Sequence, residues 1–456
     1  MPSSPRRAPG VLLLIADDWS PLARCYGNDA VQTPHIDALA ERATVFDHAF
    51  CTTPSCAASR ASLLTGMYAH EHGQYGHCHG RHGFRTHEDL GSRTLPAVLK
   101  AGGGFTGLIG KDHIAPKSVY GFDFDERGNP WDNSSMRDMA RRFFDAAEDR
   151  PFYLQAASMY PHRTPDGGFD RDVCSAMNAG DTDYAPGDVV VPPWLPDVPE
   201  VRGDLADYYR FVTRYDRFIG TMLEELERSG RLDDTLVLVL SDHGMPFPGA
   251  KASPYDSGHR CPLLVARPGG TARRSNALVN WCDLFPTACD FLDADASGLE
   301  LEGRSLLPIL DQTEPAGWDR TFFSHCFHEV TNYFPYRVVR ERRLKYVRHL
   351  APDLSLPLAS DLFDSPTWQA VLHRRLDTMG VRETAKVLRH APEELYDLDL
   401  DPHETTNLID DPRFVNDVDR MRRELTELRS RTHDPWLEVE RQAQLTAGAI
   451  ADASAV

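Results

Sequence analysis

The chain has 456 residues, of which 41% are hydrophobic and 26% charged, which is close to ordinary globular usage. This composition excludes a fibre, a disulfide knot and a largely disordered chain. Asp and Glu number 68 against 49 Lys and Arg, so the net charge is −19. Because such a surface repels phosphate backbones, we expect no nucleic-acid partner.

The N-terminal part of the sequence contains one early apolar run, residues 11–16. This run is too short for a signal peptide or a membrane span. We therefore expect a cytoplasmic protein without a membrane partner. The nine cysteines are scattered along the chain without a C-x-x-C pair, so neither a disulfide framework nor a zinc ribbon is predicted.

Four apolar runs predict the buried strands of a parallel sheet. They are rich in Val, Leu, Ile and Phe, do not alternate with polar residues, and span residues 11–16, 105–110, 151–160 and 235–240. A cluster of polar, chemically capable residues follows each run. In an open parallel sheet the ligand site lies beyond the carboxyl ends of the strands, so we expect these clusters to form one site.

Helical patterns lie between the runs. One begins at Thr33-Pro34 and continues to residue 40, a second covers about residues 94–101, and a third covers about residues 204–228. Alternating strands and helices predict an α/β domain. Residues 163–203 are rich in Pro, Gly and Asp and are predicted to form a long loop that walls a pocket.

The pattern changes beyond about Trp318. The segments TFFSHCF, YRVVRERRLKYVRHL and ELYDLDL are typical of strands in a smaller antiparallel sheet, and an amphipathic helix is predicted for residues 412–431. We therefore expect a catalytic domain of residues 1–318 and a smaller α+β C-terminal domain of residues 319–456.

The first candidate site joins Asp17-Asp18, after one strand, with Asp242-His243, after another. Three carboxylates at one point repel each other unless a cation lies between them, so a divalent ion is predicted. The oxygen-rich set suits Ca²⁺, Mg²⁺ or Mn²⁺. For one such pair alone, the alternative is that the acids cap helices or lie in turns.

The second candidate is a helix that begins near Cys56. A nucleophile there would lie at the positive end of the helix, where an anion is stabilised, and Arg60 follows one turn later on the same face. The alternative is a buried structural cysteine with a solvated arginine.

A third set consists of possible proton donors and cations on the strand ends and following loops: Lys111, His113, His162 and Lys251. A tetrahedral anion needs several donors together, and histidine titrates near neutrality. Each of these histidines alone would more often be an ordinary surface residue. Together with a metal site and a helix N-terminus, the set predicts phosphoryl or sulfuryl transfer.

The stretch CAASRASLLTG, residues 56–66, resembles the sulfatase signature C-x-P-S-R-x-x-x-L-T-G, in which the cysteine is oxidised to formylglycine. LLLIADD, TPHIDALA, IGKDHIAPKSVYGFDF, SDHGMPFP and ELYDLDLDPHETTNL extend the resemblance over nearly the whole chain. The resemblance is greatest to the sulfamidase branch, the N-sulfoglucosamine sulfohydrolases. It implies an alkaline-phosphatase-like fold with a smaller C-terminal domain, a maturation enzyme that generates formylglycine, and a homodimer.

The resemblance also implies a set of metal ligands for Ca²⁺, or for Mn²⁺ or Mg²⁺: Asp17, Asp18, Asp242, His243 and the modified Cys56. Arg60 and Lys111 would stabilise the formylglycine hydrate, and His113 would act on its hydroxyl. His162 and Lys251 would hold the sulfuryl group and help to protonate the leaving group. His328 and Glu329, in the well-matched segment HEVT, are candidate substrate contacts.

Three residues depart from the pattern of these relatives. Ala58 replaces the proline of the common signature, His243 stands where the sulfamidases carry Asn, and Tyr160 stands where they carry Asp. We therefore expect the sugar-facing wall to differ at Tyr160.

The function predicted from the sequence is hydrolysis of the nitrogen–sulfur bond of N-sulfoglucosamine or a smaller sulfamate. One alternative is an O-sulfatase or a phosphonate or phosphodiester hydrolase, which would use similar residues. From a different class, a non-catalytic binder of sulfated sugars would have lost metal or nucleophile residues, and this chain has lost neither.

Overall fold

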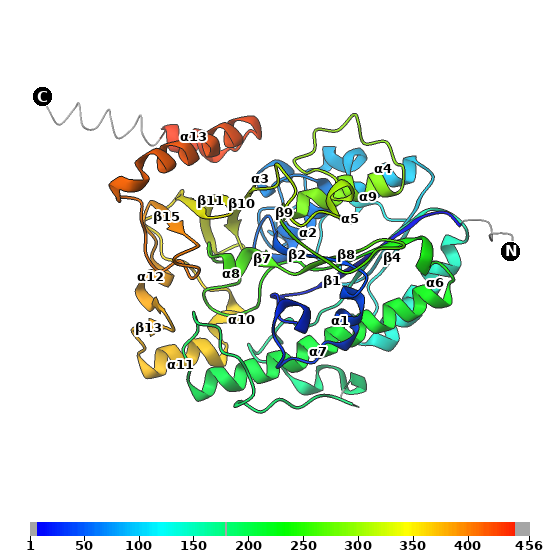
Figure 1. Cartoon of the computed structure of the whole chain (residues 1–456), viewed down its shortest axis with the longest axis horizontal. Helices are drawn as coiled ribbons and strands as arrows, with labels where there is room; N and C mark the ends of the chain where they lie inside the picture. Colours follow the sequence, from blue (N-terminus) through cyan, green and yellow to red (C-terminus); the bar gives the residue numbers. More distant parts are fainter. Residues whose placement is uncertain (1–6, 178–179, 443–456) are drawn as a thin grey trace, which may run out of the picture.

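A computed structural model of the chain describes residues 7–177 and 180–442 (Figure 1). It contains a large, mostly parallel sheet covered by helices on both faces and a smaller antiparallel sheet formed by the C-terminal part of the chain. None of the helices among these residues combines the length and apolar character that crossing a membrane requires.

The large sheet has the strand order β4-β3-β5-β1-β6-β8-β2-β7, and β9 pairs with β2. Its strands are β1 (Gly10–Ala16), β2 (Thr44–Phe50), β3 (Phe105–Gly110), β4 (Phe124–Glu126), β5 (Phe152–Ala157), β6 (Thr235–Ser241), β7 (Arg260–Cys261), β8 (Leu263–Ala266) and β9 (Arg273–Asn280). The five strands from β4 to β6 are parallel, whereas β8 runs antiparallel to both β6 and β2.

The strand register aligns the carboxyl ends of the four predicted strands. Ala16 at the end of β1 pairs with Ser241 at the end of β6, and Gly110 of β3 pairs with Ala157 of β5. The polar residues that follow these strands therefore emerge at one edge of the sheet.

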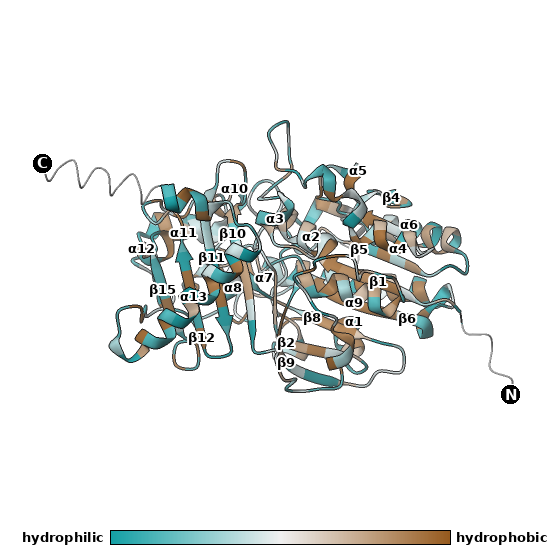
Figure 2. Ribbon diagram, turned by 90° about the horizontal axis from the view of Figure 1, so that it is seen from above, coloured by the Kyte–Doolittle hydropathy of each residue, from teal (hydrophilic) through white to brown (hydrophobic). Residues whose placement is uncertain are grey.

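Alternate residues of β1 face two separate cores, because successive side chains of a strand point to opposite faces. Leu12 and Leu14 pack with residues of α1 (Pro34–Ala40), α6 (Asn133–Ala147) and α7 (Pro199–Arg228). Leu13 and Ile15 pack with residues of α2 (Cys56–Thr65), α4 (Leu95–Ala101) and α9 (Leu284–Phe291). These helices form the two outer layers, and Figure 2 shows that the strands between them are largely hydrophobic.

The small sheet has the order β10-β11-β12-β15 and is antiparallel throughout. Its strands are β10 (Arg320–Phe327), β11 (Tyr333–Glu341), β12 (Leu344–His349) and β15 (Glu393–Asp397). One face packs under the amphipathic helix α13 (Val415–Arg431), and the other contacts Phe50 and Leu278 of the large sheet.

The remaining elements are short. They are α3 (Ala69–His72), α5 (Lys117–Tyr120), α8 (Asp256–His259), α10 (Ser360–Phe363), α11 (Pro366–Arg374), α12 (Thr384–Leu388), and the strands β13 (Thr378–Met379) and β14 (Arg382–Glu383).

The predicted α/β architecture with a smaller antiparallel sheet is confirmed. The predicted helix 204–228 was too short, because α7 begins at Pro199, whose fixed φ suits the first helical turn. The segment predicted as a long loop contains a 3₁₀ helix over Arg171–Met177. The division into domains 1–318 and 319–456 stays a prediction, although the small sheet begins at Arg320.

Candidate active site

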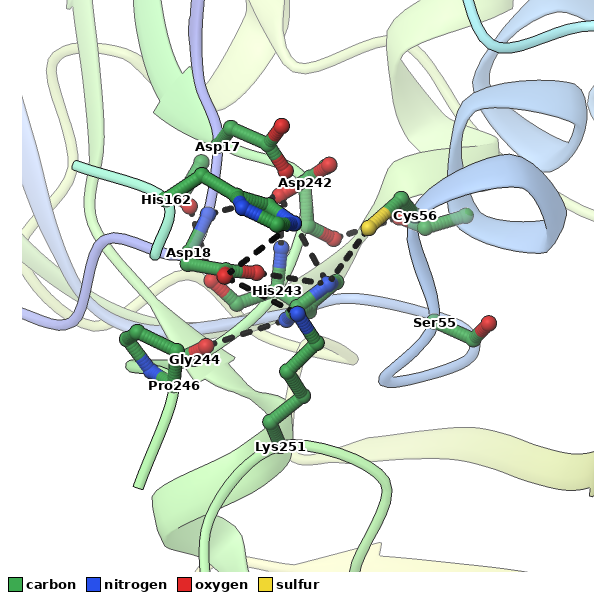
Figure 3. Close-up of polar contacts among 12 residues, drawn as sticks. Asp17, Asp18, Ser55, Cys56, His162, Asp242, His243, Gly244, Pro246 and Lys251 are labelled. Atoms are coloured by element: carbon green, nitrogen blue, oxygen red, sulfur yellow. Dashed lines mark hydrogen bonds and ion pairs between the residues drawn. The ribbon is translucent and has the colours of Figure 1, made fainter. Parts of the chain in front are cut away.

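The carboxylates that follow β1 and β6 meet at one point (Figure 3). The backbone N–H of Asp18 donates to Oδ1 of Asp242 at 3.1 Å, and the backbone N–H of Asp242 donates to the carbonyl of Ala16 at 3.2 Å. Asp17, Asp18 and Asp242 are all buried. The structure therefore brings together the two acidic pairs that the strand-end argument predicted.

His243 orients one ring nitrogen toward these carboxylates. Its Nδ1 lies 3.0 Å from the carbonyl of Gly244, to which it donates, so Nε2 carries no proton in the neutral ring. Nε2 lies 3.1 Å from Oδ1 of Asp18 and 3.2 Å from Sγ of Cys56. With Nδ1 as the donor, Nε2 can offer its lone pair toward the same point, as a metal ligand requires.

These residues fit a divalent cation. The Oδ1 atoms of Asp17 and Asp18 are buried and accept no hydrogen bond from the residues that the structure describes. Candidate ligand atoms of Asp17, Cys56, Asp242 and His243 all lie within 4.8 Å of one another. Burial and the neighbouring Asp17 raise the pKa of Asp242 despite the opposing effect of Arg60, so a further positive charge nearby would favour its charged form. A hard oxygen-binding ion such as Ca²⁺, Mg²⁺ or Mn²⁺ matches this donor set.

Helix α2 places Cys56 at its first position, with Ser55 at the N-cap. Burial raises the pKa of the Cys56 thiol to about 11. Arg60 is 1% exposed and donates to Oδ2 of Asp242 from Nε at 3.0 Å and from Nη2 at 2.9 Å. The alternative of a solvated arginine is therefore wrong. Nη1 of Arg60 is a buried donor without an acceptor among residues 7–177 and 180–442.

Two lysines neutralise the acidic pair after β1. Lys111, which follows β3, forms an ion pair with Asp17. Lys251 lies between two carboxylates, with Nζ 3.0 Å from Oδ2 of Asp18 and 2.7 Å from Oδ2 of Asp361. Asp361 was not predicted from the sequence, because it comes from α10 and no local pattern marks it.

His162 follows β5 and faces the same carboxylates. Its Nδ1 donates to the carbonyl of Arg163 at 2.5 Å, which leaves Nε2 3.8 Å from Oδ2 of Asp18. Burial lowers the pKa of His162, but Asp18 and Asp17 outweigh that effect and the net pKa is raised. The ring can therefore carry a proton at Nε2, as a general acid requires.

His113 lies in a group of histidine rings beside Cys56. Both of its ring nitrogens are buried, and neither has a hydrogen-bond partner in the described part of the chain. Burial, together with Lys111, holds its pKa well below the usual range. The rings of His77 and His79 lie 4.8 and 4.5 Å from the His113 ring. Sequence reasoning missed these two residues, although the histidine-rich run HCHGRH, residues 77–82, is a visible signal.

The two candidate substrate contacts occupy different places. Nδ1 of His328 lies 3.1 Å from Oγ of Ser55, and its ring lies 4.1 Å from the ring of His77, so it borders the helix N-terminus. Glu329 accepts a hydrogen bond from the backbone N–H of Ser360 at 3.1 Å, at the start of α10. It therefore supports the helix that carries Asp361. Substrate contact by either residue stays a prediction.

Tyr160 does not face the site, contrary to expectation. It is 0% exposed, and its ring packs against Trp131 and Phe211. Its hydroxyl accepts a hydrogen bond from Nη1 of Arg214 at 3.3 Å. A bulky aromatic ring gains more from this apolar contact than from solvent, so Tyr160 belongs to the core.

Comparison with known proteins agrees with this geometry. A family model described as Sulfatase matches residues 9–294. The chain belongs to the sulfatase family. It is 38% identical to the human N-sulphoglucosamine sulphohydrolase over 95% of this chain and 91% of that protein. It is 26% identical to an ulvan-active sulfatase of Formosa agariphila, over 94% of this chain and 74% of that protein.

Solved structures of other proteins share the fold. One, described as bound to its substrate D-glucosamine-2-N,6-O-disulfate, has a TM-score of 0.68 at 18% identity and covers 94% of this chain and 99% of its own. The phosphonate monoester hydrolase of Agrobacterium radiobacter has a TM-score of 0.66 at 21% identity, and the match covers 93% of this chain and 96% of that one. The alkaline-phosphatase-like sulfatase fold is thus confirmed, and sulfatases hydrolyse sulfate esters and sulfamates.

Proposed function

We propose that this sulfatase is a sulfamidase, which hydrolyses the nitrogen–sulfur bond of N-sulfoglucosamine or of a smaller sulfamate. The observation that carries the proposal is the 38% identity to a curated N-sulphoglucosamine sulphohydrolase over 95% of the chain. The site supports it, because His162, a candidate acid for the leaving nitrogen, faces the acidic cluster beside Cys56.

The proposal includes two groups that the residues of this site would hold. A maturation enzyme would convert Cys56 to formylglycine, and Asp17, Asp18, Asp242 and His243 would bind Ca²⁺, or Mn²⁺ or Mg²⁺. Together these groups supply a hydrated aldehyde as the nucleophile and a positive charge that stabilises its anion. The fully buried position of Cys56 at a helix N-terminus excludes bulk water from the nucleophile.

The other residues would bind the substrate and move protons. Lys251 would hold the sulfuryl oxygens as a point charge. Lys111 and Nη1 of Arg60 would stabilise developing negative charge on the hydrate. An amide anion is a much worse leaving group than an alkoxide, so the nitrogen must be protonated as the nitrogen–sulfur bond breaks. His162 would deliver that proton from Nε2. Neutral His113 would then accept the proton of the second hydroxyl of the hydrate, which allows sulfate to leave.

The overall reaction consumes one water and one sulfamate and releases sulfate and the free amine. Incubation of matured, metal-supplemented protein with N-sulfoglucosamine should release sulfate and glucosamine in equal amounts. Mass spectrometry of the peptide that contains residue 56 should show the aldehyde in the same preparation. Cys56→Ser should remove turnover, by about a thousandfold or more. A sample that carries the aldehyde, binds a divalent cation and releases no sulfate from any sulfamate would refute the proposal.

A further inference from the structure

A second cavity lies where the two sheets meet, apart from the catalytic residues. Its volume is about 560 Å³, which lies within the range of small-molecule sites. The large-sheet region contributes Tyr26, His48 and Arg260, and the C-terminal region contributes Arg340 and Arg342. None of the proposed metal ligands or catalytic residues lines it.

The cavity is positively charged, although the protein carries a net charge of −19. Four arginines line it, Arg260, Arg340, Arg342 and Arg382, against two acids, Asp256 and Asp399. The carboxylate of Asp256 is already bound by Nε of Arg340 at 2.9 Å and by Nζ of Lys345 at 2.9 Å. Asp256 therefore has little capacity left to neutralise the other guanidinium groups.

Arg260 and Arg342 have no anionic partner within the described part of the chain. Arg260 donates from Nε to the carbonyl of Asp47 at 2.9 Å, and Arg342 donates from Nη1 to the carbonyl of Asn276 at 2.7 Å. Neither forms an ion pair with a carboxylate of residues 7–177 or 180–442. Two guanidinium groups thus retain donors for an oxyanion, which arginine binds well through paired N–H groups.

The pKa of His48 reflects the positive charge of the cavity. Burial, Arg260 and Arg340 lower its pKa to about 4, and the opposing effects of Asp256 and Asp47 are smaller. Its Nδ1 is buried, and no described residue forms a hydrogen bond with it. An anion in the cavity would offset the two arginines and favour protonation of this ring.

Aromatic side chains in the walls of the cavity also suit the binding of a sugar or aryl ring. Trp194 lines it beside Pro192 in the segment before α7, and Tyr26 lines it from a 3₁₀ helix over Arg24–Tyr26. The hydroxyl of Tyr26 is already hydrogen bonded to the backbone of Leu263. Aromatic side chains offer faces on which a sugar or aryl ring can stack.

We propose that this cavity binds a small anion that carries a ring, either a sulfated or carboxylated sugar or an aryl sulfate. The oxyanion would lie against Arg260 and Arg342, and the ring against Trp194 and Tyr26. This inference does not depend on the sulfamidase reaction, because the two sites share no residue.

The experiment uses anions that a sulfatase does not hydrolyse. Benzenesulfonate carries an aryl ring, glucuronate carries a sugar ring, and methanesulfonate carries no ring. Each is titrated into protein with isotope-labelled histidine, and the His48 signal is assigned by its absence in His48→Gln. A saturable shift of that signal, with a higher titration midpoint in the complex, is expected for at least one ring-bearing anion. A shift with benzenesulfonate but not with glucuronate would indicate an aryl ligand. A shift with glucuronate but not with benzenesulfonate would indicate a sugar.

Charge-removing variants locate the oxyanion. Arg260→Gln combined with Arg342→Gln should weaken binding by about tenfold or more. Arg342→Lys keeps the charge but loses the paired N–H groups, so its affinity should lie between those of the wild type and the double variant. Arg423→Gln, on the exposed face of α13, is the matched control and should bind as the wild type does. An unchanged His48 signal with every anion, equal affinity for methanesulfonate, or full affinity in the double variant would overturn the proposal.

Discussion

Nε2 of His243, which follows β6, lies 3.2 Å from Sγ of Cys56, the first residue of α2. The same nitrogen lies 3.1 Å from Oδ1 of Asp18. Three potential ligand atoms from three separate segments therefore face one another, and the protonated Nδ1 of His243 points away toward the carbonyl of Gly244. This arrangement is consistent with a cation that connects these atoms.

A divalent cation should stabilise the protein as well as activate it. Adding Ca²⁺ to chelator-treated protein, at a hundred times its Kd, should raise the free energy of unfolding by about 2.7 kcal/mol. Asp18→Asn should remove most of this gain, because it deletes a charged ligand. Differential scanning calorimetry with and without the ion measures the effect, and Asp149→Asn, an exposed acid, is the control. Equal stabilisation of wild type and Asp18→Asn would contradict the assigned metal site.

The role of His162 can be separated from general damage to the site by the choice of leaving group. His162→Gln should reduce kcat/KM for N-sulfoglucosamine by a factor of about 10² to 10⁴, because the leaving nitrogen needs a proton. The loss for 4-nitrophenyl sulfate should be much smaller, since a nitrophenolate leaves without protonation. His82→Gln, which changes an exposed histidine, serves as the control. Equal losses on both substrates would show that His162 is not the acid.

Asp361 is predicted to position Lys251 without contacting the substrate. Asp361→Asn leaves Lys251 paired with Asp18 alone, so the ammonium group should shift toward the acidic cluster. We expect kcat/KM to fall by about tenfold, mostly through KM, and Asp361→Glu to restore part of it. The neighbouring Asp364 is exposed, and Asp364→Asn supplies the matched control. If the two Asn variants have the same kinetics, Asp361 has no such role.

His70 should make the protein less stable as the pH falls. Burial, followed by Arg337, lowers its pKa to about 3 from its usual 6.5. Between these values the unfolded chain binds a proton that the folded protein does not, so acid favours unfolding by about 1.4 kcal/mol per pH unit. Stability from this group is complete above pH 6.5 and is lost as the pH falls toward 3.

Urea unfolding at several pH values from 4 to 7 measures this effect. In His70→Gln the free energy of unfolding should fall less steeply with decreasing pH, by up to about 1.4 kcal/mol per pH unit. The amide can still hydrogen bond to Thr432, whose Oγ1 lies 2.7 Å from Nε2 of His70. His373→Gln, at the exposed end of α11, should leave the slope as in wild type. An identical slope in His70→Gln and wild type would refute the assignment.

Within the large sheet, the strands that the sequence predicts correctly are those buried on both faces. Continuous apolar runs form β1, β3, β5 and β6. Such runs are typical of parallel strands that are covered by helices on both faces of the sheet. β2 and β9 were missed, because β2 contains Asp47 and His48 and β9 begins with two exposed arginines. Their strand conformation comes from pairing with each other, which no local pattern shows.

The residues of the candidate site likewise include some that the sequence predicts and others that it does not. Asp17 and Asp242 could be placed together because parallel strands end at one edge of a sheet. Asp361 reaches the site from the distant helix α10, and His77 from an irregular segment, so tertiary packing alone places them. Tyr160 shows the opposite error, since its position beside a motif does not determine the direction of its side chain. The cytoplasmic location and the homodimer stay predictions.

The most direct test of the sulfamidase assignment is a comparison of kcat/KM for N-sulfoglucosamine, cyclohexylsulfamate and 4-nitrophenyl sulfate on one metal-supplemented preparation. The fraction of converted Cys56 multiplies all three values equally, so incomplete maturation cancels in their ratios. We predict that N-sulfoglucosamine exceeds the aryl sulfate by about a hundredfold or more. Preference for cyclohexylsulfamate would keep the sulfamidase chemistry with a different amine, whereas preference for the aryl sulfate would contradict the account and identify an O-sulfatase.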